Sequence, residues 1–222
     1  MLESEMVNNM NKYLQKSGIC YANEIRMGTG IPDISFNIGA NKKIKYIDDY
    51  FLFSILDYVT GKNETTIQEI GKEFLFTLEK VKKYVSQLVN MSLVRVNNQI
   101  VKAIKNIFDT KLGTTIAIEA KIKDWKNGFI QAQRYLAFSD YSYLALQEEY
   151  ISNVDIELLK KSGIGLLSVK DGKIEIVVQA VKSGVCDFSL KYMHTSSIIY
   201  KYKSNITKYI KKKSNIFSFC EA

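Results

Sequence analysis

Two carboxylates and one lysine are the residues of this chain whose types and spacing point most directly to chemistry. Asp33 follows Pro32 at the start of one apolar run, and Glu119 and Lys121 end another. Residues i and i+2 of a strand share a face, so Glu119 and Lys121 are expected to point the same way. If the two runs pair as strands, Asp33 meets Glu119 across the sheet.

Two carboxylates beside a lysine match what phosphodiester hydrolysis needs. A cation held by the carboxylates polarises the phosphate and the attacking water, while the lysine orients that water or offsets charge in the transition state. Oxygen ligands favour Mg²⁺ or Mn²⁺ over zinc. The alternative is an ordinary strand start at Asp33 and an exposed Glu-x-Lys pair. Charge at the ends of apolar strands is costly without a partner or a role, which favours the site.

A third element lies on the helix predicted at 125–138, where Gln131 and Tyr135 are i, i+4 neighbours on one face. Together with Pro32-Asp33 and Glu119-x-Lys121, this Gln-x-x-x-Tyr element resembles the PD-(D/E)xK (restriction-endonuclease-like) nuclease superfamily, in its RecB-like branch. The resemblance covers residues 1–38 and 114–178. It implies that Asp33 and Glu119 bind the metal and that Lys121 positions the attacking water. Gln131 and Tyr135 would contact the substrate or support the site.

Members of that superfamily often add an acid from the first helix. Glu5 or Glu3 is the candidate here, and Glu24 is less suited because it precedes the catalytic hairpin. The chain departs from the family pattern in the long interval between Asp33 and Glu119. A structureless interval of that length would argue against the resemblance.

The elements expected to position these residues form an α/β fold with the restriction-endonuclease-like αβββαβ core order. Apolar periodicity and turn residues predict each element. The predicted elements are helices at 2–17, 125–138 and 153–161, and strands at 21–27, 31–38, 114–121, 141–147, 164–169 and 173–178. The helix at 2–17 is expected to bury Met6, Met10, Tyr13 and Leu14.

The long interval between Asp33 and Glu119 is predicted to form a folding unit of its own. Helices are predicted at 48–60, 66–74 and 78–91. Thr65 or Thr66 is expected to cap the second, with Glu69 three residues beyond Thr66 as in a capping box, and Thr77 the third. Two β-prone runs around Asn97-Asn98 then predict a hairpin. Three helices followed by a hairpin is the order of a winged helix-turn-helix. We therefore expect a nuclease domain at 1–40 and 112–222, interrupted by a winged helix domain at 41–111.

The third helix of this insert is the expected DNA-reading element. Its buried face is predicted to comprise Leu78, Val81, Val85, Leu88 and Val89. A second face offers donors for phosphates and base edges, and the hairpin adds two cations. The predicted DNA-binding residues are Lys80, Lys83, Tyr84, Gln87, Arg95 and Lys102. The alternative is that the insert serves as a protein-interaction module.

Composition is compatible with a nucleic-acid partner. The 222 residues carry a formal net charge of +8, and 46% of them are hydrophobic, enough for a packed core. A solvated lysine-rich surface would give the same charge. The N-terminus shows no signal peptide, and no run of about 18 apolar residues predicts a membrane span. A cytoplasmic protein without membrane contact is expected, and a homodimer is compatible with the sequence.

Several residues are not expected to act. Cys20, Cys186 and Cys220 are widely spaced and the chain has a single histidine, so a Cys/His zinc site is not predicted. The cysteines are expected to be ordinary buried or partly buried thiols. His194 is expected in a loop or helix start without a role. The basic stretch 200–219 predicts a C-terminal amphipathic helix.

The sequence thus predicts a Mg²⁺- or Mn²⁺-dependent DNA endonuclease whose insert binds DNA. One alternative is a non-catalytic DNA-binding or regulatory protein that retains a nuclease-like fold. Another is a scaffold subunit that uses the winged helix for protein contacts. RNA in place of DNA is a lesser variant.

Overall fold

The protein has a mixed α/β fold, seen here in a computed structural model that describes residues 2–217. Its contacts divide the chain into two units. Unit 1 comprises Met1–Lys42 and Leu112–Ala222, and unit 2 comprises Lys43–Lys111. The insert predicted at 41–111 thus begins two residues before the observed unit 2.

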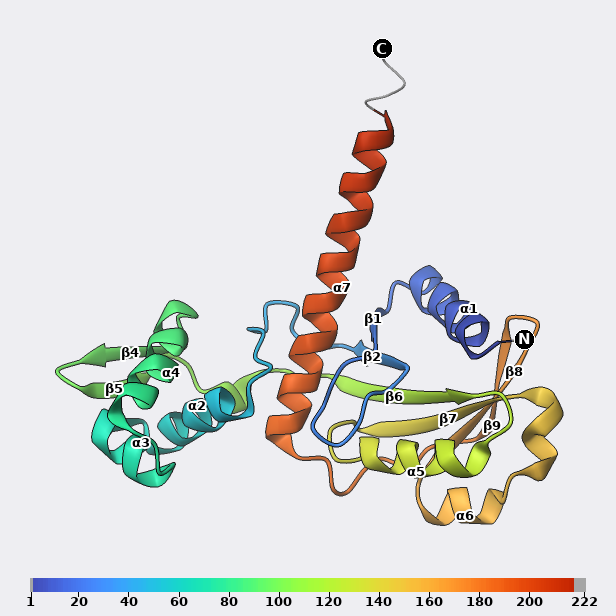
Figure 1. The fold of residues 1–222 in the computed structure, drawn as a ribbon, viewed down its shortest axis with the longest axis horizontal. Coiled ribbons are helices and arrows are strands. Elements are labelled where there is room, and N and C mark those ends of the chain that lie inside the picture. Colours follow the sequence, from blue (N-terminus) through green and yellow to red (C-terminus); the bar gives the residue numbers. More distant parts are fainter. Residues whose placement is uncertain (1, 218–222) are drawn as a thin grey trace. The chain divides into compact units, whose positions relative to one another are not determined.

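Unit 1 is built on a six-stranded mixed sheet (Figure 1). The strands β1 (Cys20–Asn23), β2 (Ile34–Ile38), β6 (Thr114–Lys121), β7 (Tyr141–Gln147), β8 (Gly165–Lys170) and β9 (Lys173–Val178) lie side by side in the order β1-β2-β6-β7-β8-β9. The pairs β6–β7 and β7–β8 are parallel, and the other neighbours are antiparallel. The helices of unit 1 are α1 (Glu3–Lys16), α5 (Trp125–Tyr135), α6 (Ile156–Lys161) and α7 (Phe188–Phe217).

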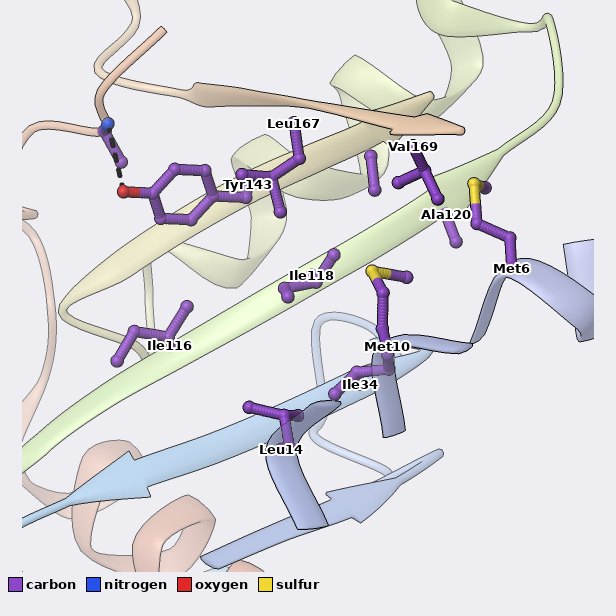
Figure 2. Packing of buried hydrophobic residues seen from close by; sticks show 12 residues of the cluster. Met6, Met10, Leu14, Ile34, Ile116, Ile118, Ala120, Tyr143, Leu167 and Val169 are labelled. Carbon is purple, nitrogen blue, oxygen red and sulfur yellow. Dashed lines mark hydrogen bonds between the residues drawn. The ribbon is translucent and has the colours of Figure 1, made fainter. Parts of the chain in front are cut away.

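One face of the sheet packs against α1 (Figure 2). Met6, Met10 and Leu14 recur at helical spacing and are buried against sheet residues that include Ile34 and Ile118. Tyr13 was predicted to share this buried face but is 60% exposed, because it lies beside the stripe rather than on it. The opposite face of the sheet packs against α5 and α6. Alternate residues of β6 therefore face α1 and α5.

The predicted bounds are right for some of the strands that carry the candidate site and wrong for others. The predicted bounds of β6 and β7 are confirmed. β1 ends early because Glu24 adopts a left-handed backbone conformation (φ 51°), and β2 begins only at Ile34. Between them, Met27 and Gly30 form an isolated antiparallel bridge across Gly28 and Thr29. Asp33 therefore lies immediately before β2 rather than inside it.

Unit 2 contains α2 (Tyr50–Lys62), β3 (Glu64–Thr66), α3 (Ile67–Glu73), α4 (Leu78–Asn90), β4 (Val94–Asn97), β5 (Ile100–Ala103) and a short 3-10 turn, η1 (Ile107–Asp109). The predicted three helices and hairpin are confirmed, as are the caps: Thr66 and Glu69 form a capping box, and Thr77 accepts a hydrogen bond from the Lys80 amide. β3 was not predicted; it pairs with β5, giving the order β3-β5-β4.

Two details of unit 2 correct the prediction. The hairpin turn lies at Asn98 and Gln99, both with positive φ, because Asn97 still pairs with Ile100. The buried stripe of α4 is also narrower than expected. Val81, Val85 and Leu88 are buried, whereas Leu78 is 47% and Val89 40% exposed.

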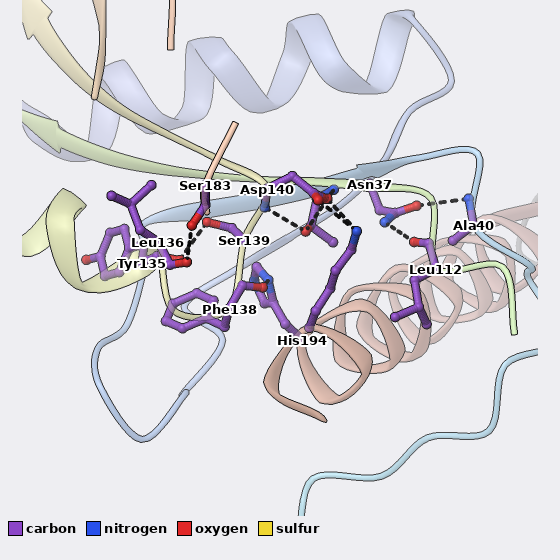
Figure 3. Close-up of polar contacts among 12 residues, drawn as sticks. Asn37, Ala40, Leu112, Tyr135, Leu136, Phe138, Ser139, Asp140, Ser183 and His194 are labelled. Carbon is purple, nitrogen blue, oxygen red and sulfur yellow. Dashed lines mark hydrogen bonds and ion pairs between the residues drawn. The ribbon is translucent and has the colours of Figure 1, made fainter. Parts of the chain in front are cut away.

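α7 begins at Phe188, well before the predicted start near residue 200. This places His194 inside a helix and fully buried, which corrects the expectation of an incidental loop residue (Figure 3). Its Nε2 lies 2.8 Å from Ser35 Oγ and its Nδ1 lies 3.3 Å from the Phe138 carbonyl oxygen. Phe138 also packs edge to face on the imidazole. His194 thus joins α7 to β2 and to the segment that follows α5.

Some predictions concern residues at or beyond the described range. Cys20 is buried and Cys186 half-buried as free thiols, while Cys220 and the end of the stretch 200–219 lie outside the described residues. Among residues 2–217, none of the helices has the length and apolar character needed to cross a bilayer.

Candidate active site

The strand register places the two predicted carboxylates together. β2 and β6 pair antiparallel with Ile34 opposite Ile118, so the same register continued by one residue sets Asp33 opposite Glu119. Asp33 Oδ2 accepts a hydrogen bond of 2.7 Å from the Ala120 backbone amide. The Asn23 side chain donates to the Asp33 carbonyl at 2.8 Å and joins the end of β1 to the same point. The predicted pairing of the two strands is confirmed.

Glu119 is the centre of the cluster, with only 2% of its surface exposed. Its Oε1 accepts a hydrogen bond of 2.6 Å from Lys121 Nζ, and its Oε2 accepts one of 2.5 Å from the Tyr135 hydroxyl. The Tyr135 hydroxyl also lies 3.1 Å from the Ile31 carbonyl oxygen. Residues from β6, α5 and the segment before β2 therefore converge on one buried carboxylate.

Burial dominates the electrostatics of both carboxyl groups. It raises the pKa of Glu119 above its ordinary value, although the hydrogen bonds from Lys121 and Tyr135 oppose the shift. It also raises the pKa of Asp33, against the lowering effect of the Ala120 amide and the Lys121 charge. The negative charge of Asp33 also raises the pKa of Glu119. A cation bound between them would relieve this repulsion.

The two other polar groups respond to the same negative charge. Burial lowers the pKa of Lys121, but its hydrogen bond to Glu119 and the charges of Glu119, Asp33 and Glu3 outweigh burial and leave the pKa raised. Burial and the hydrogen bond to Glu119 raise the pKa of Tyr135 far above its ordinary value. At neutral pH the lysine is therefore a cation and the tyrosine a hydrogen-bond donor.

Two glycines leave room for these side chains. A Cβ at Gly30 would lie 2.7 Å from Tyr135 Cε1, and a Cβ at Gly128 would lie 2.9 Å from Lys121 Cγ and 2.5 Å from Leu144 Cδ1. Neither glycine was predicted from the sequence to belong to the site. The position of Gly30 just before Pro32-Asp33 was the available signal.

Gln131 lies one helical turn before Tyr135 on α5. Its Oε1 is buried and has no hydrogen-bond partner among the described residues. A buried acceptor without a donor is unfavourable by about 1–3 kcal/mol, so it marks a position where a water or ligand donor is expected. Both members of the Gln-x-x-x-Tyr element therefore have unusual surroundings. Tyr135 lies beside negatively charged carboxylates, and Gln131 has a buried oxygen without a donor.

Of the two acids considered on α1, the structure brings Glu3 to the cluster. Glu3 Oε1 accepts a 3.4 Å hydrogen bond from the Ile122 amide at the end of β6, and its charge raises the pKa of Asp33. Glu5 instead accepts a hydrogen bond from the Leu2 amide and closes the N-terminus of α1. Glu5 therefore has a structural reason to be present that is separate from the cluster.

The predicted DNA-binding side chains all belong to unit 2 and fall into two groups. Lys83, Gln87 and Arg95 are exposed. The other three are engaged within the unit. Lys80 is also exposed but lies over an aromatic ring, Tyr84 donates a hydrogen bond to Asp49, and Lys102 forms a 3.4 Å ion pair with Glu64.

The donor set suits a hard divalent cation. Among the side chains that the structure describes, those of residues 2–206, no group of three His, Cys, Asp or Glu is placed to hold a metal. Mg²⁺ is commonly held by one or two carboxylates and otherwise keeps water or substrate oxygens. Asp33 is half-buried and Glu119 is buried, and both have raised pKa values, which fits that pattern. They lack the His or Cys ligands that protein zinc sites usually include.

Comparisons with known proteins leave the family open. No protein-family model and no curated protein matches the chain. A solved structure of a protein of unknown function from Silicibacter pomeroyi is similar at 18% sequence identity and a TM-score of 0.33. The similarity covers 44% of this chain and 61% of that protein. It carries no argument about fold or activity.

Proposed function

We propose that this protein is a Mg²⁺- or Mn²⁺-dependent endonuclease of the PD-(D/E)xK type that hydrolyses phosphodiester bonds in DNA. The observation that carries the proposal is the convergence of Asp33, Glu119, Lys121 and Tyr135 on one buried point, as the split motif predicts. A purely structural ion pair would not need a second carboxylate opposite the first.

The residues divide the chemistry among them. Asp33 and Glu119 would hold the cation, which supplies Lewis acidity toward the phosphate and the attacking water. Lys121 would orient that water or offset charge on the phosphorus centre. Tyr135 fixes one Glu119 oxygen through its hydroxyl, so the carboxylate enters the reaction already oriented. Gln131 offers its unpartnered Oε1 to a donor on the substrate or on a water.

Unit 2 is proposed to be a winged helix that contacts the nucleic acid. Its order of three helices and a hairpin, with the third strand β3 on the hairpin, supports this interpretation. Lys83, Gln87 and Arg95 are the exposed side chains that can reach phosphates or bases. Replacing Lys83 and Arg95 together should weaken DNA binding and reduce its salt dependence.

The test is a cleavage screen of duplex, single-stranded, flap and junction DNA with Mg²⁺, Mn²⁺ or EDTA. Lys121→Gln should lose cleavage while retaining DNA binding. Lys123→Gln removes the same charge from an exposed position two residues along and serves as the control. Equal cleavage by both variants would contradict the proposal. Cleavage of RNA but not of DNA would show that the protein is a ribonuclease instead.

A non-catalytic DNA-binding protein is the second candidate, and one observation favours it. Both Glu119 oxygens already accept hydrogen bonds from Lys121 and Tyr135, a closed arrangement that needs no metal. The same screen separates the two functions. DNA binding without cleavage in either metal would support the non-catalytic candidate.

A further inference from the structure

The surface of unit 2 carries a connected group of rings and one lysine, here called the aromatic–lysine cluster. It consists of Tyr50, Phe51, Phe76, Lys80 and Tyr84. Ring centroids lie 6.0 Å apart for Tyr50 and Phe51, 5.2 Å for Phe51 and Phe76, and 5.9 Å for Phe76 and Tyr84, the last pair stacked. The cluster joins the start of α2, the segment before α4 and one side of α4.

The rings at the start of α2 are not part of the core. Tyr50 is 54% and Phe51 45% exposed, whereas Phe53 and Leu56 on the same helix are completely buried. Exposed apolar side chains are normal when scattered, but adjacent ones in a connected group indicate a binding surface. The cluster is such a group.

Lys80 lies over two of the rings of the cluster. Its Nζ lies 3.6 Å from the centre of Phe76 and 5.4 Å from the centre of Phe51. A cation over a ring is attracted by the negative π-face, and this contact is worth little at an exposed site. The ring face is thus covered by a movable side chain, which a flat ligand can displace.

The surrounding charge favours an anionic ligand. Lys82 and Lys83 follow Lys80 on α4 and are exposed. Of the two acids before α2, Asp49 caps the helix through the Leu52 amide at 2.9 Å and accepts a hydrogen bond from Tyr84, and Asp48 accepts one from the Tyr46 hydroxyl at 2.6 Å. Within α4 itself, Lys80, Lys82 and Lys83 accompany a single acid, Glu79, so this helix presents a net positive charge beside the rings.

We propose that the aromatic–lysine cluster binds unpaired bases of single-stranded DNA. The bases stack on Phe51 and Tyr50, while Lys80 leaves the ring face and pairs with a phosphate. Base–aromatic stacking tolerates any sequence because every base has a π-face, and basic side chains beside the rings track the backbone. The inference rests on the proposed function only in taking DNA as the nucleic acid.

Duplex reading by α4 fits the same residues less well. Groove recognition needs side chains that extend to base edges. Lys80 instead lies on ring faces, and Tyr84 bonds to Asp49. Paired bases also hide their π-faces from Phe51. The unit therefore suits DNA with an unpaired stretch, such as a flap, an overhang or an opened duplex.

The experiment measures binding of the full chain in EDTA, so that metal-dependent cleavage does not interfere. Fluorescence anisotropy would compare a labelled 20-nucleotide oligothymidylate, an abasic strand of the same length and a hairpin duplex. The variants are Phe51→Ala and, as control, Ile104→Ala, another exposed apolar position of unit 2 (48%). Thermal unfolding by circular dichroism confirms that both variants are folded.

The proposal predicts tighter binding of the oligothymidylate than of the duplex or the abasic strand. Phe51→Ala should weaken oligothymidylate binding by about fivefold or more and leave duplex binding within twofold. Ile104→Ala should change neither. Equal affinity for normal and abasic strands, or no effect of Phe51→Ala, would overturn it, as would capture of protein partners without DNA binding. Loss of cleavage in Glu119→Gln with single-strand binding intact would confirm the two proposals separately.

Discussion

The Tyr135 hydroxyl donates a hydrogen bond of 2.5 Å to Glu119 Oε2, joining α5 to the central strand β6. Both groups are almost completely buried, with Tyr135 1% and Glu119 2% exposed. The contact fixes one oxygen of the carboxylate and directs the other toward Lys121. The helix after the catalytic strand thus orients the group to which we assign metal binding.

Replacing Tyr135 by Phe removes this donor and keeps the ring. Cleavage should fall by about 10–100-fold, the usual effect of losing a group that orients a metal ligand. Because the Tyr135 hydrogen bond lowers the pKa of Glu119, its loss should also move the acid limb of the pH–rate profile to higher pH. Tyr143→Phe is the control, since its hydroxyl accepts from Gln179 at 2.8 Å on the other face of the sheet. Equal effects of both variants would show that a general loss of packing is responsible.

The space left by Gly30 gives a second prediction. An Ala Cβ there would lie 2.7 Å from Tyr135 Cε1, whereas a Cβ at Gly28 meets nothing within 4 Å. Gly30→Ala should therefore displace the tyrosine ring and lower cleavage by about tenfold or more. Gly28→Ala, two residues away in the same turn, should cleave normally. Normal cleavage by Gly30→Ala would show that activity does not depend on the position of the Tyr135 ring.

Metal binding should stabilise unit 1. At a Mg²⁺ concentration 100 times the dissociation constant, the gain is about 2.7 kcal/mol, or roughly 5–10 °C in Tm. Trp125 is the sole tryptophan of the chain and lies in unit 1, so its fluorescence follows this transition. Asp33→Asn should abolish the shift. Asp171→Asn, in an exposed turn, should retain it. A shift that survives Asp33→Asn would place the cation elsewhere.

The same pair predicts how metal affinity depends on pH. Burial raises the pKa of both Asp33 and Glu119, so protons compete with the cation at a higher pH than for ordinary carboxylates. Without metal, the stabilisation gained by protonating the pair is present at low pH and lost as pH rises through the raised pKa values. The Mg²⁺-induced shift in Tm should therefore grow with pH through this window. A pH-independent shift would argue against binding by these two groups.

His194 makes a separate prediction about stability. Burial lowers its pKa to about 4, below the ordinary 6.5, against the opposing effects of the Phe138 carbonyl and Asp140. Below pH 6.5 the His194 imidazole of the unfolded chain binds a proton, whereas that of the folded chain binds one only below about pH 4. The free energy of unfolding should therefore fall by about 3 kcal/mol across this window. His194→Gln should remove this component. An unchanged pH dependence in that variant would assign it to the carboxyl groups.

The sequence predicted the central strands well and the ends of elements less well. β6 and β7 were located correctly because uniform apolar runs between turn residues leave one interpretation. β1 and β2 were predicted too long because nothing in the sequence marks the left-handed backbone at Glu24. β3 was missed because Thr65 and Thr66 were read only as caps, although Thr66 both pairs with Ile100 and caps α3.

The candidate site was predictable where residue type and strand register decide it. Asp33, Glu119 and Lys121 follow from period-two geometry once β2 and β6 pair. Contacts that depend on how a helix packs were out of reach. The choice of Glu3 over Glu5 turns on where α1 begins. The burial of His194 depends on α7 starting before residue 200.

The central claim is tested most directly by metal-dependent DNA cleavage in the wild type and in Glu119→Gln. The variant keeps the size of the side chain and an acceptor for Tyr135 but removes the negative charge that would hold the cation. The account predicts cleavage by the wild type in Mg²⁺ or Mn²⁺, none in EDTA, and a loss of about a thousandfold or more in the variant with DNA binding retained. Cleavage by Glu119→Gln at the wild-type rate would contradict it.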